Sequence, residues 1–296
     1  MKIHKILFLA FVLLTMNSCR QRNIVLNTQG VAASASLRSV FGPQMADAYD
    51  RSDWNAILLM ADSIKRGGEP IDDMVLLYAK ALEETGSPER AVEVLTASLA
   101  EQTSITPRYY LYHELGSAYS ALKDYENAVA AYKAALTLQP SYARPMVGLG
   151  QALAESGDIE SAMYYYSLAS NLFDENEMAD ELLAIGSAMV NIAPDDPNGW
   201  QTLANGFDYL GQYEKEEECL NNKAAIFLKD KSFFSDESKM QDFLMLNLQM
   251  AVTCFHMERY QDCLKYIDVI HENSTTMGDY DEIVTHLYEE SKIKLN

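Results

Sequence analysis

Apolar side chains recur every three or four positions along most of the chain after about residue 44, with polar side chains between them. This spacing gathers the apolar positions on one face of an α-helix, so the pattern predicts amphipathic helices rather than strands. Glycines and prolines interrupt the pattern at intervals that suit helix pairs joined by short turns. Only 14 Gly and 8 Pro occur beside abundant Ala, Leu and Glu, a composition that favours the same all-α fold class.

Residues 109–142 show the most regular spacing in the chain. Small residues are expected where two antiparallel helices cross closely, aromatic and Leu side chains fill the space between them, and a proline ends the second helix. The positions are Tyr112, Leu115, Gly116, Tyr119, Ala128, Tyr132 and Pro140. This set resembles the signature of the tetratricopeptide repeat family. The resemblance implies a right-handed α-solenoid whose concave groove binds a protein or peptide.

Weaker copies of the pattern flank this repeat, at residues 72–104, 143–174, 198–229 and 243–270, and residues 279–295 predict a polar capping helix. The alternation fails in between. Glu177 to Ile192 predicts one helix, ended by Pro194, without a first-helix partner of its own. Either an extra helix breaks the alternation there or a degenerate pair is hidden.

Residues 1–19 have the composition of a targeting segment. Lys2 and Lys5 precede an apolar run from Ile6 to Met16, which is shorter than the roughly 20 residues of a membrane-spanning helix. Asn17, Ser18 and Cys19 follow directly, and Ser18 and Cys19 resemble the lipobox of bacterial lipoproteins, in which the cysteine becomes the acylated first residue. The alternative is an ordinary secretory signal with an incidental cysteine.

Residues 20–43 lack helical periodicity and predict a flexible tether, and residues 44–296 predict the solenoid. An acidic export tag, which marks surface-displayed lipoproteins in some phyla, is absent after Cys19. The resemblance therefore implies an outer-membrane lipoprotein that faces the periplasm.

The formal net charge of -20 argues against nucleic acid as a partner, because its phosphates would be repelled. Cys219, Cys254 and Cys263 show no CxxC spacing, and buried free thiols are favoured over a disulfide. No metal, cofactor or catalytic residue is predicted, since paired His ligands, phosphate loops and nucleophile elbows are missing from the sequence.

Glu214 to Glu218 are interpreted as a solvated helix face. Tyr164 to Tyr166 are interpreted as packing rather than a sugar platform.

The repeat register predicts which residues line the groove. They are Lys80, Glu83, Tyr110, His113, Ser117, Arg144, Gln151, Asn198, Gln201 and Asn205. This mixture of Tyr and amides suits hydrogen bonding to a peptide backbone or a polar polymer. It differs from the basic carboxylate clamp of the cochaperone members of the family, which disfavours acidic C-terminal tails.

These observations together predict a non-catalytic, protein-binding scaffold or adaptor that is lipid-anchored in the bacterial cell envelope. Two other roles within the resemblance stay open: an accessory of outer-membrane β-barrel assembly, and a glycan-uptake binding lipoprotein. The glycan binders are longer chains with a ligand-binding insertion, and no segment here fits one. A hidden peptidase or glycosidase would need a facing pair of carboxylates, for which the sequence offers no candidate spacing.

Overall fold

The computed structural model of the chain describes residues 43–67, 74–100, 106–229, 236–274 and 278–296. These residues form α-helices and one short 3-10 helix, with no strand among them, so the predicted all-α fold class is confirmed. Within the same ranges, no helix is both long and apolar enough to cross a membrane. The predicted leader, Cys19 and the predicted tether through residue 42 lie outside the described residues.

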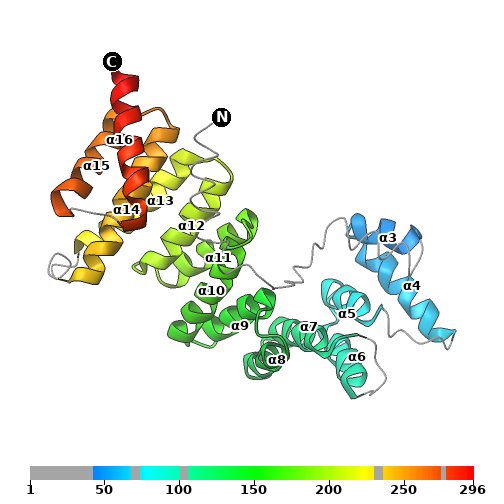
Figure 1. The fold of residues 1–296 in the computed structure, drawn as a ribbon. Coiled ribbons are helices and arrows are strands. Elements are labelled where there is room, and N and C mark those ends of the chain that lie inside the picture. Colours follow the sequence, from blue (N-terminus) through cyan, green and yellow to red (C-terminus); the bar gives the residue numbers. More distant parts are fainter. Residues whose placement is uncertain (1–42, 68–73, 101–105, 230–235, 275–277) are drawn as a thin grey trace. The chain divides into compact units, whose positions relative to one another are not determined.

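Within each compact unit, most helices that are neighbours in sequence pack against each other (Figure 1). In chain order they are α3 (Pro43–Asp50), α4 (Trp54–Arg66), α5 (Val75–Glu84), α6 (Pro88–Ala100), α7 (Arg108–Ala121), α8 (Tyr125–Leu138), α9 (Ala143–Glu155), α10 (Ile159–Asp174), α11 (Ala179–Ile192), α12 (Pro197–Tyr209), α13 (Tyr213–Lys229), α14 (Glu237–His256), α15 (Tyr260–Asn273), the 3-10 helix η3 (Gly278–Tyr280) and α16 (Asp281–Leu295).

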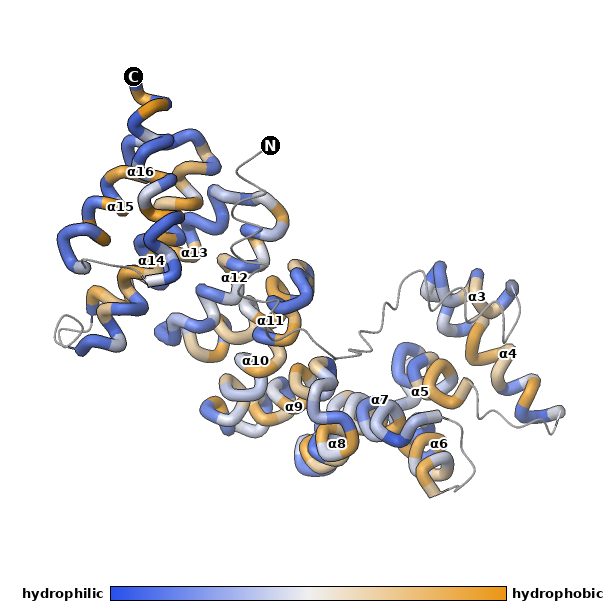
Figure 2. Tube along the Cα trace, viewed as in Figure 1, coloured by the Kyte–Doolittle hydropathy of each residue, from blue (hydrophilic) through white to orange (hydrophobic). Residues whose placement is uncertain are grey.

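The chain divides within α10 into two compact units, an N-terminal unit that ends at Leu172 and a C-terminal unit that begins at Phe173. In the N-terminal unit α5 contacts α7 and α7 contacts α9, as expected for the first helices of stacked pairs. In the C-terminal unit α16 packs on α15 and α14, which confirms the predicted capping helix. Orange apolar and blue polar positions alternate along the helices in Figure 2, so each helix has an apolar face to bury.

One turn recurs between the two helices of a pair. A residue with positive φ donates its N–H to the carbonyl three residues back, and the next residue donates to the carbonyl five residues back. This is the Schellman arrangement, which satisfies the last carbonyls of the first helix. The left-handed residues are Ser52, Gly86, Lys123, Gly157, Glu177, Gly211 and Glu258.

These turns show how the alternation of helices breaks near residue 177. The turn from α9 to α10 contains Gly157, and the turn from α10 to α11 contains Glu177 (φ 54°), so two pair-type turns follow each other. The end of α11 instead matches the end of α8, because the N–H groups of Ala193 and Gln139 both bond to the carbonyl four residues back. Because α9 and α10 form a pair around Gly157, α11 is the extra helix, which is the first of the two alternatives that the sequence left open.

Tyr132 on α8 fills the space between α7 and α9 in the N-terminal unit. A Cβ atom on Gly116 of α7 would lie 2.6 Å from Cε1 of Tyr132, and one on Gly148 of α9 would lie 2.7 Å from the same atom. The ring is 4% exposed and needs both glycines to fit. Gly150 accommodates Tyr166 in the same way, with a closest approach of 2.9 Å. Tyr164, by contrast, is 60% exposed.

The C-terminal unit has its own apolar core on α14, α15 and α16, including Leu248, Ile267 and Leu287. Cys219, Cys254 and Cys263 are buried and free, as the sequence predicted. Burial raises the pKa of the Cys219 and Cys254 thiols to about 11, so both remain protonated at neutral pH.

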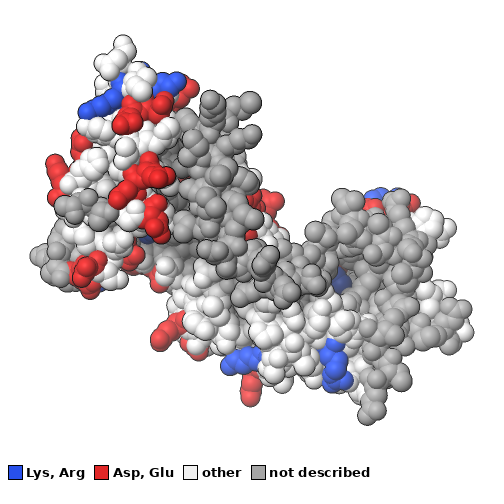
Figure 3. Space-filling view, viewed as in Figure 1, with Lys and Arg blue, Asp and Glu red and all other residues white. Residues whose placement is uncertain are grey.

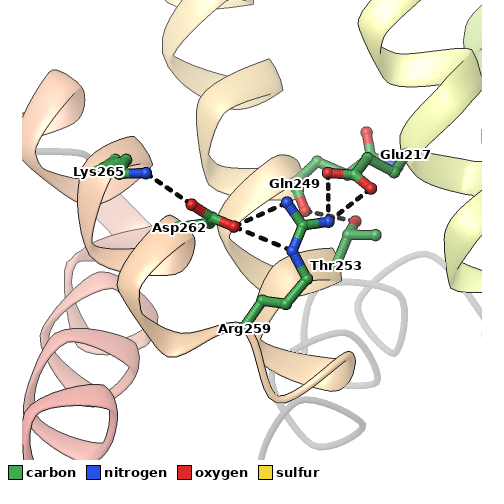
Figure 4. Close-up of polar contacts among 6 residues, drawn as sticks. All are labelled: Glu217, Gln249, Thr253, Arg259, Asp262 and Lys265. Atoms are coloured by element: carbon green, nitrogen blue, oxygen red, sulfur yellow. Dashed lines mark hydrogen bonds and ion pairs between the residues drawn. The ribbon is translucent and has the colours of Figure 1, made fainter. Parts of the chain in front are cut away.

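A charged network joins α13 to α15 through the turn after α14 (Figure 4). The guanidinium of Arg259 donates from Nη1 to both oxygens of Glu217 at 2.7 Å, and from Nη2 to Oδ2 of Asp262 at 2.7 Å. Lys265 donates to the other oxygen of Asp262, also at 2.7 Å. Hydrogen bonds from Lys265 and Arg259 lower the pKa of Asp262. The network connects α13 to α15, and each of its four charged side chains is paired within it.

Candidate functional site

Helix α7 presents one polar face. Tyr110, His113, Glu114 and Ser117 stand at i, i+3, i+4 and i+7, the spacing of a single helix face. The register had predicted all of them except Glu114. On an adjacent side of the helix, Leu111 and Ala118 are fully buried in the core and hold the polar face in place.

Helix α5 lies beside this face and connects to it by one hydrogen bond. The hydroxyl of Ser117 donates to Oε2 of Glu83 at 2.8 Å. The other oxygen, Oε1, is buried and has no hydrogen-bond partner among the residues that the structure describes. Burial raises the pKa of Glu83 despite that hydrogen bond and the charge of Lys80. Lys80 itself pairs with Glu84 at 2.7 Å.

Aromatic rings from three segments pack together next to these polar groups. The ring centroids of Tyr109 and Tyr110 are 4.3 Å apart, and the ring of Tyr142 lies 5.5 Å from Tyr110 in an edge-on arrangement. The His113 ring lies 5.4 Å from Tyr142 and 5.8 Å from Tyr132. Such edge-to-face contacts fix the orientation of the rings. Tyr142 directly precedes α9, so the cluster extends from α7 to α9.

Glu114 and His113 do not form an ion pair, although Nε2 and Oε1 are 3.9 Å apart. Burial, and then the charges of Arg144 and Lys80, lower the pKa of His113 to about 4. Burial, and then the charge of Glu83, raise the pKa of Glu114 to about 7. At neutral pH the imidazole is therefore neutral, and the carboxyl is divided between its two protonation states.

These residues form one surface, the α5–α7–α9 face. The face comprises Lys80 and Glu83 on α5, Tyr110, His113, Glu114 and Ser117 on α7, and Tyr142 and Arg144 at the start of α9. The structure thus brings together most of the groove residues that the register predicted for the N-terminal unit. Gln151 lies further along α9 and is exposed.

The predicted amides of the C-terminal unit are arranged differently. Nε2 of Gln201 donates to Oδ1 of Asn205 at 2.7 Å and to Oε1 of Gln249 at 2.9 Å. Asn205 in turn donates to Oδ1 of Asp174 at 3.0 Å. These side chains link α10, α12 and α14, so their hydrogen-bonding capacity is used within the chain. Asn198 is exposed in the first turn of α12 and stands apart from this network.

Glu216 corrects one interpretation of the acidic run from Glu214 to Glu218. The sequence predicts a solvated helix face for this run, but the structure shows that Glu216 is only 2% exposed. It occupies the position of Ala128 in the clear repeat, so it points into the helix pair. Gln249 donates to its Oε1 at 3.4 Å. Burial, and then the charge of Asp208, raise the pKa of Glu216 to about 8.

Some residues of this face beyond the predicted ones are indicated by the sequence pattern. Glu114 stands four positions after Tyr110, so helical spacing alone places it on the polar face. Tyr142 and Tyr109 flank predicted positions in sequence, but their ring contacts depend on how α7 and α9 pack. In the described residues, no group of three or more His, Cys, Asp and Glu side chains could hold a metal ion.

Comparison with known proteins supports the repeat class. Residues 116–157, from the middle of α7 to the turn after α9, match the model of a tetratricopeptide repeat family (TPR repeat). No curated protein matches the chain.

Solved structures of repeat proteins are similar to the chain only at a distance. A crystal structure of MamA has 17% identity and a TM-score of 0.39, with 62% of this chain and 95% of that one covered. The TPR2AB domain of yeast Sti1, in complex with a pHSP90 segment, has 15% identity and a TM-score of 0.35, covering 89% and 100%. A tetratricopeptide repeat protein from Parabacteroides merdae has 13% identity and a TM-score of 0.37, covering 90% and 100%. The family model that matches residues 116–157 identifies that segment as a tetratricopeptide repeat.

Proposed function

We propose that this chain is a non-catalytic scaffold that binds a protein or peptide segment on its α5–α7–α9 face. The observation that carries the proposal is the difference between the two polar surfaces. The amides of Gln201 and Asn205 have partners within the chain, whereas Oε1 of Glu83 and Nδ1 of His113 have none among the described residues. Buried polar atoms without partners cost free energy, and a ligand that pairs with them recovers it.

The aromatic rings on this face support a peptide as the ligand. Tyr side chains offer a large contact area with little loss of conformational entropy, and they are enriched where proteins bind each other. Tyr109, Tyr110 and Tyr142 already hold one another in fixed orientations through ring contacts. A segment that binds there would meet a preorganised surface.

Site-specific photocrosslinking would test this proposal. A photoreactive phenylalanine analogue replaces Tyr110 on the proposed face or, as the matched control, the exposed Tyr164 on α10. We expect irradiated cells to yield a discrete adduct with the analogue at position 110 and none at position 164. Adducts of equal yield at both positions, or none at position 110, would contradict binding at this face.

We further propose that the scaffold is lipid-anchored through Cys19 in the outer membrane, where it faces the periplasm. The support is the leader sequence, in which Cys19 follows the short apolar run after Asn17 and Ser18. Several acyl chains on one cysteine would make the attachment durable, because each buried CH₂ contributes about 0.8 kcal/mol.

Replacing Cys19 by Ala is expected to move the protein from the membrane fraction to the soluble fraction and to abolish incorporation of labelled palmitate. Ser36→Ala in the predicted tether, a substitution of similar size, should leave both readouts unchanged. Equal membrane association of the Cys19→Ala variant and the parent chain would rule out lipidation at this residue. Recovery of the parent chain itself in the soluble fraction would favour an ordinary secretory signal.

A further inference from the structure

The α5–α7–α9 face and the adjacent Glu84 hold three carboxyl groups, Glu83, Glu84 and Glu114, against two cations, Lys80 and Arg144. Glu83 on α5 and Glu114 on α7 interact electrostatically, and both are partly buried. Lys80 pairs with Glu84, and Arg144 lies within electrostatic range of Glu114. Both cations lower the pKa of Glu114, but burial and the charge of Glu83 outweigh them and hold it near 7. The site therefore has one carboxyl group more than it has cations.

The carboxyl of Glu114 remains within reach of a ligand, because its side chain is 23% exposed. Glu83 lies deeper: one oxygen accepts from Ser117, and the other is buried without a partner among the described residues. The remaining facing groups, Tyr132 on α8 and Tyr142 before α9, are neutral at physiological pH because burial raises the pKa of each phenol. The neutral His113 likewise supplies no charge.

The rings beside the carboxyls suit a cation as well. A Lys or Arg head group within about 6 Å of a ring centroid is attracted to the aromatic face. The chain uses this contact elsewhere: Nζ of Lys65 lies 5.9 Å from the Tyr78 ring, and the Arg108 guanidinium lies 5.8 Å from the Tyr112 ring. Aromatic rings and carboxylates together form a typical binding site for a basic side chain.

We propose that the α5–α7–α9 face binds a Lys or Arg side chain of the partner segment, with Glu114 as its anionic contact, Glu83 as a second negative charge behind it, and Tyr110 and Tyr142 beside its aliphatic stem. This inference rests on the proposed function and specifies the chemistry of the partner. The formal net charge of -20 favours a basic partner and repels an acidic one. A carboxylate-bearing ligand would also leave Oε1 of Glu83 without a donor.

Selection from a library of short random peptides on the full chain, purified in detergent, would test the inference. We expect Lys or Arg to be enriched at one position of the selected peptides, and substitution of that residue by norleucine to weaken binding at least tenfold. The variant E83Q/E114Q should lose this preference. The matched control E126Q/E160Q removes the same charge from exposed residues of the same unit and should keep it. A melting curve for each variant shows that it is folded.

The pH dependence provides a second readout, which general attraction to an acidic protein would not produce. A cation needs Glu114 ionised, so the selected peptide should bind about tenfold more weakly at pH 6 than at pH 8, and E114Q should remove most of this difference. Enrichment of acidic peptides that depends on Tyr110 would overturn the cation preference but keep the proposed function. Enrichment of basic peptides that persists in E83Q/E114Q would also overturn it, and no enrichment at all would overturn both proposals.

Discussion

Replacement of Gly116 by Leu is expected to destabilise the N-terminal unit by about 3 kcal/mol or more, because it overpacks a core that has no room for the added atoms. A Cβ atom alone would lie 2.6, 2.7 and 2.9 Å from ring carbons of Tyr132. The ring has no room to move toward α9, because it already packs closely against Gly148 of that helix. A Cβ atom on Gly148 would lie only 2.4 Å from Cζ of Tyr132. Tyr132 would have to leave its position between the helices.

Thermal and urea unfolding, followed by circular dichroism, would measure this effect. Ala121→Leu is the matched control, since it adds the same side chain at an exposed position of the same helix and should change stability little. A double variant, G116A/Y132L, should be less destabilised than the sum of its single substitutions, because a smaller residue at 132 relieves the contact. If Gly116→Leu unfolds like the parent chain, then α7 and α8 do not pack as described.

The sequence predicted the close helix contact at Gly116, because the pattern that indicates this contact lies within a single helix pair. Close helix contacts require small residues, and the spacing of Gly116 and Tyr132 around the turn identifies the pair of helices that meet there. The same reasoning predicted the buried free cysteines and the capping helix, which the structure confirms as α16. Periodicity predicts a face well when each helix contacts its sequence neighbours.

The place of the extra helix α11 could not be predicted by such reasoning. The turn from α10 into α11 has Glu177 in the left-handed position, where Gly86, Gly157 and Gly211 occupy the equivalent position of other turns. Glycine is the residue that marks this conformation in a sequence, because it adopts positive φ without steric cost. Without it, the hydrogen bond from Met178 to Phe173 is visible only in the structure.

The candidate site was predictable in position but not in chemistry. Helical spacing placed Tyr110, His113 and Ser117 on one face, and the structure brings Glu83 against them. How strongly Glu114 is buried, and which rings surround it, depends on side chains from three helices. The amides of α12 illustrate the same limit, because Gln201 looks equally available in the sequence but its side-chain amide is bonded within the chain.

Glu216 leads to the second large prediction, which concerns the pH dependence of stability in the C-terminal unit. The folded chain holds this carboxyl at a pKa of about 8, against an ordinary value of 4.5. Between those two pH values the folded state keeps a proton that the unfolded state releases. The free energy of unfolding therefore falls as pH rises from about 4.5 to 8, and it does so by about 1.4 kcal/mol per unit of pKa shift.

Glu216→Gln should remove this loss of stability, since a glutamine amide resembles the protonated carboxyl and never ionises. We expect the variant and the parent chain to have nearly equal stability at pH 5, and the variant to be more stable at pH 8 by on the order of 4 kcal/mol. Urea unfolding at a series of pH values would measure the difference. Glu218→Gln, at an exposed position of the same helix, is the control and should follow the parent chain throughout.

The comparison of these two variants isolates Glu216 from its neighbours. Burial also raises the pKa of Asp174 and Asp208, so the parent chain should lose stability with rising pH for more than one reason. Those groups remain in both variants, and their contribution largely cancels in the difference. Parallel pH profiles for Glu216→Gln and Glu218→Gln would mean that Glu216 is solvated after all. A difference that grows with pH would mean that the chain keeps a protonated carboxyl where the clear repeat has Ala128.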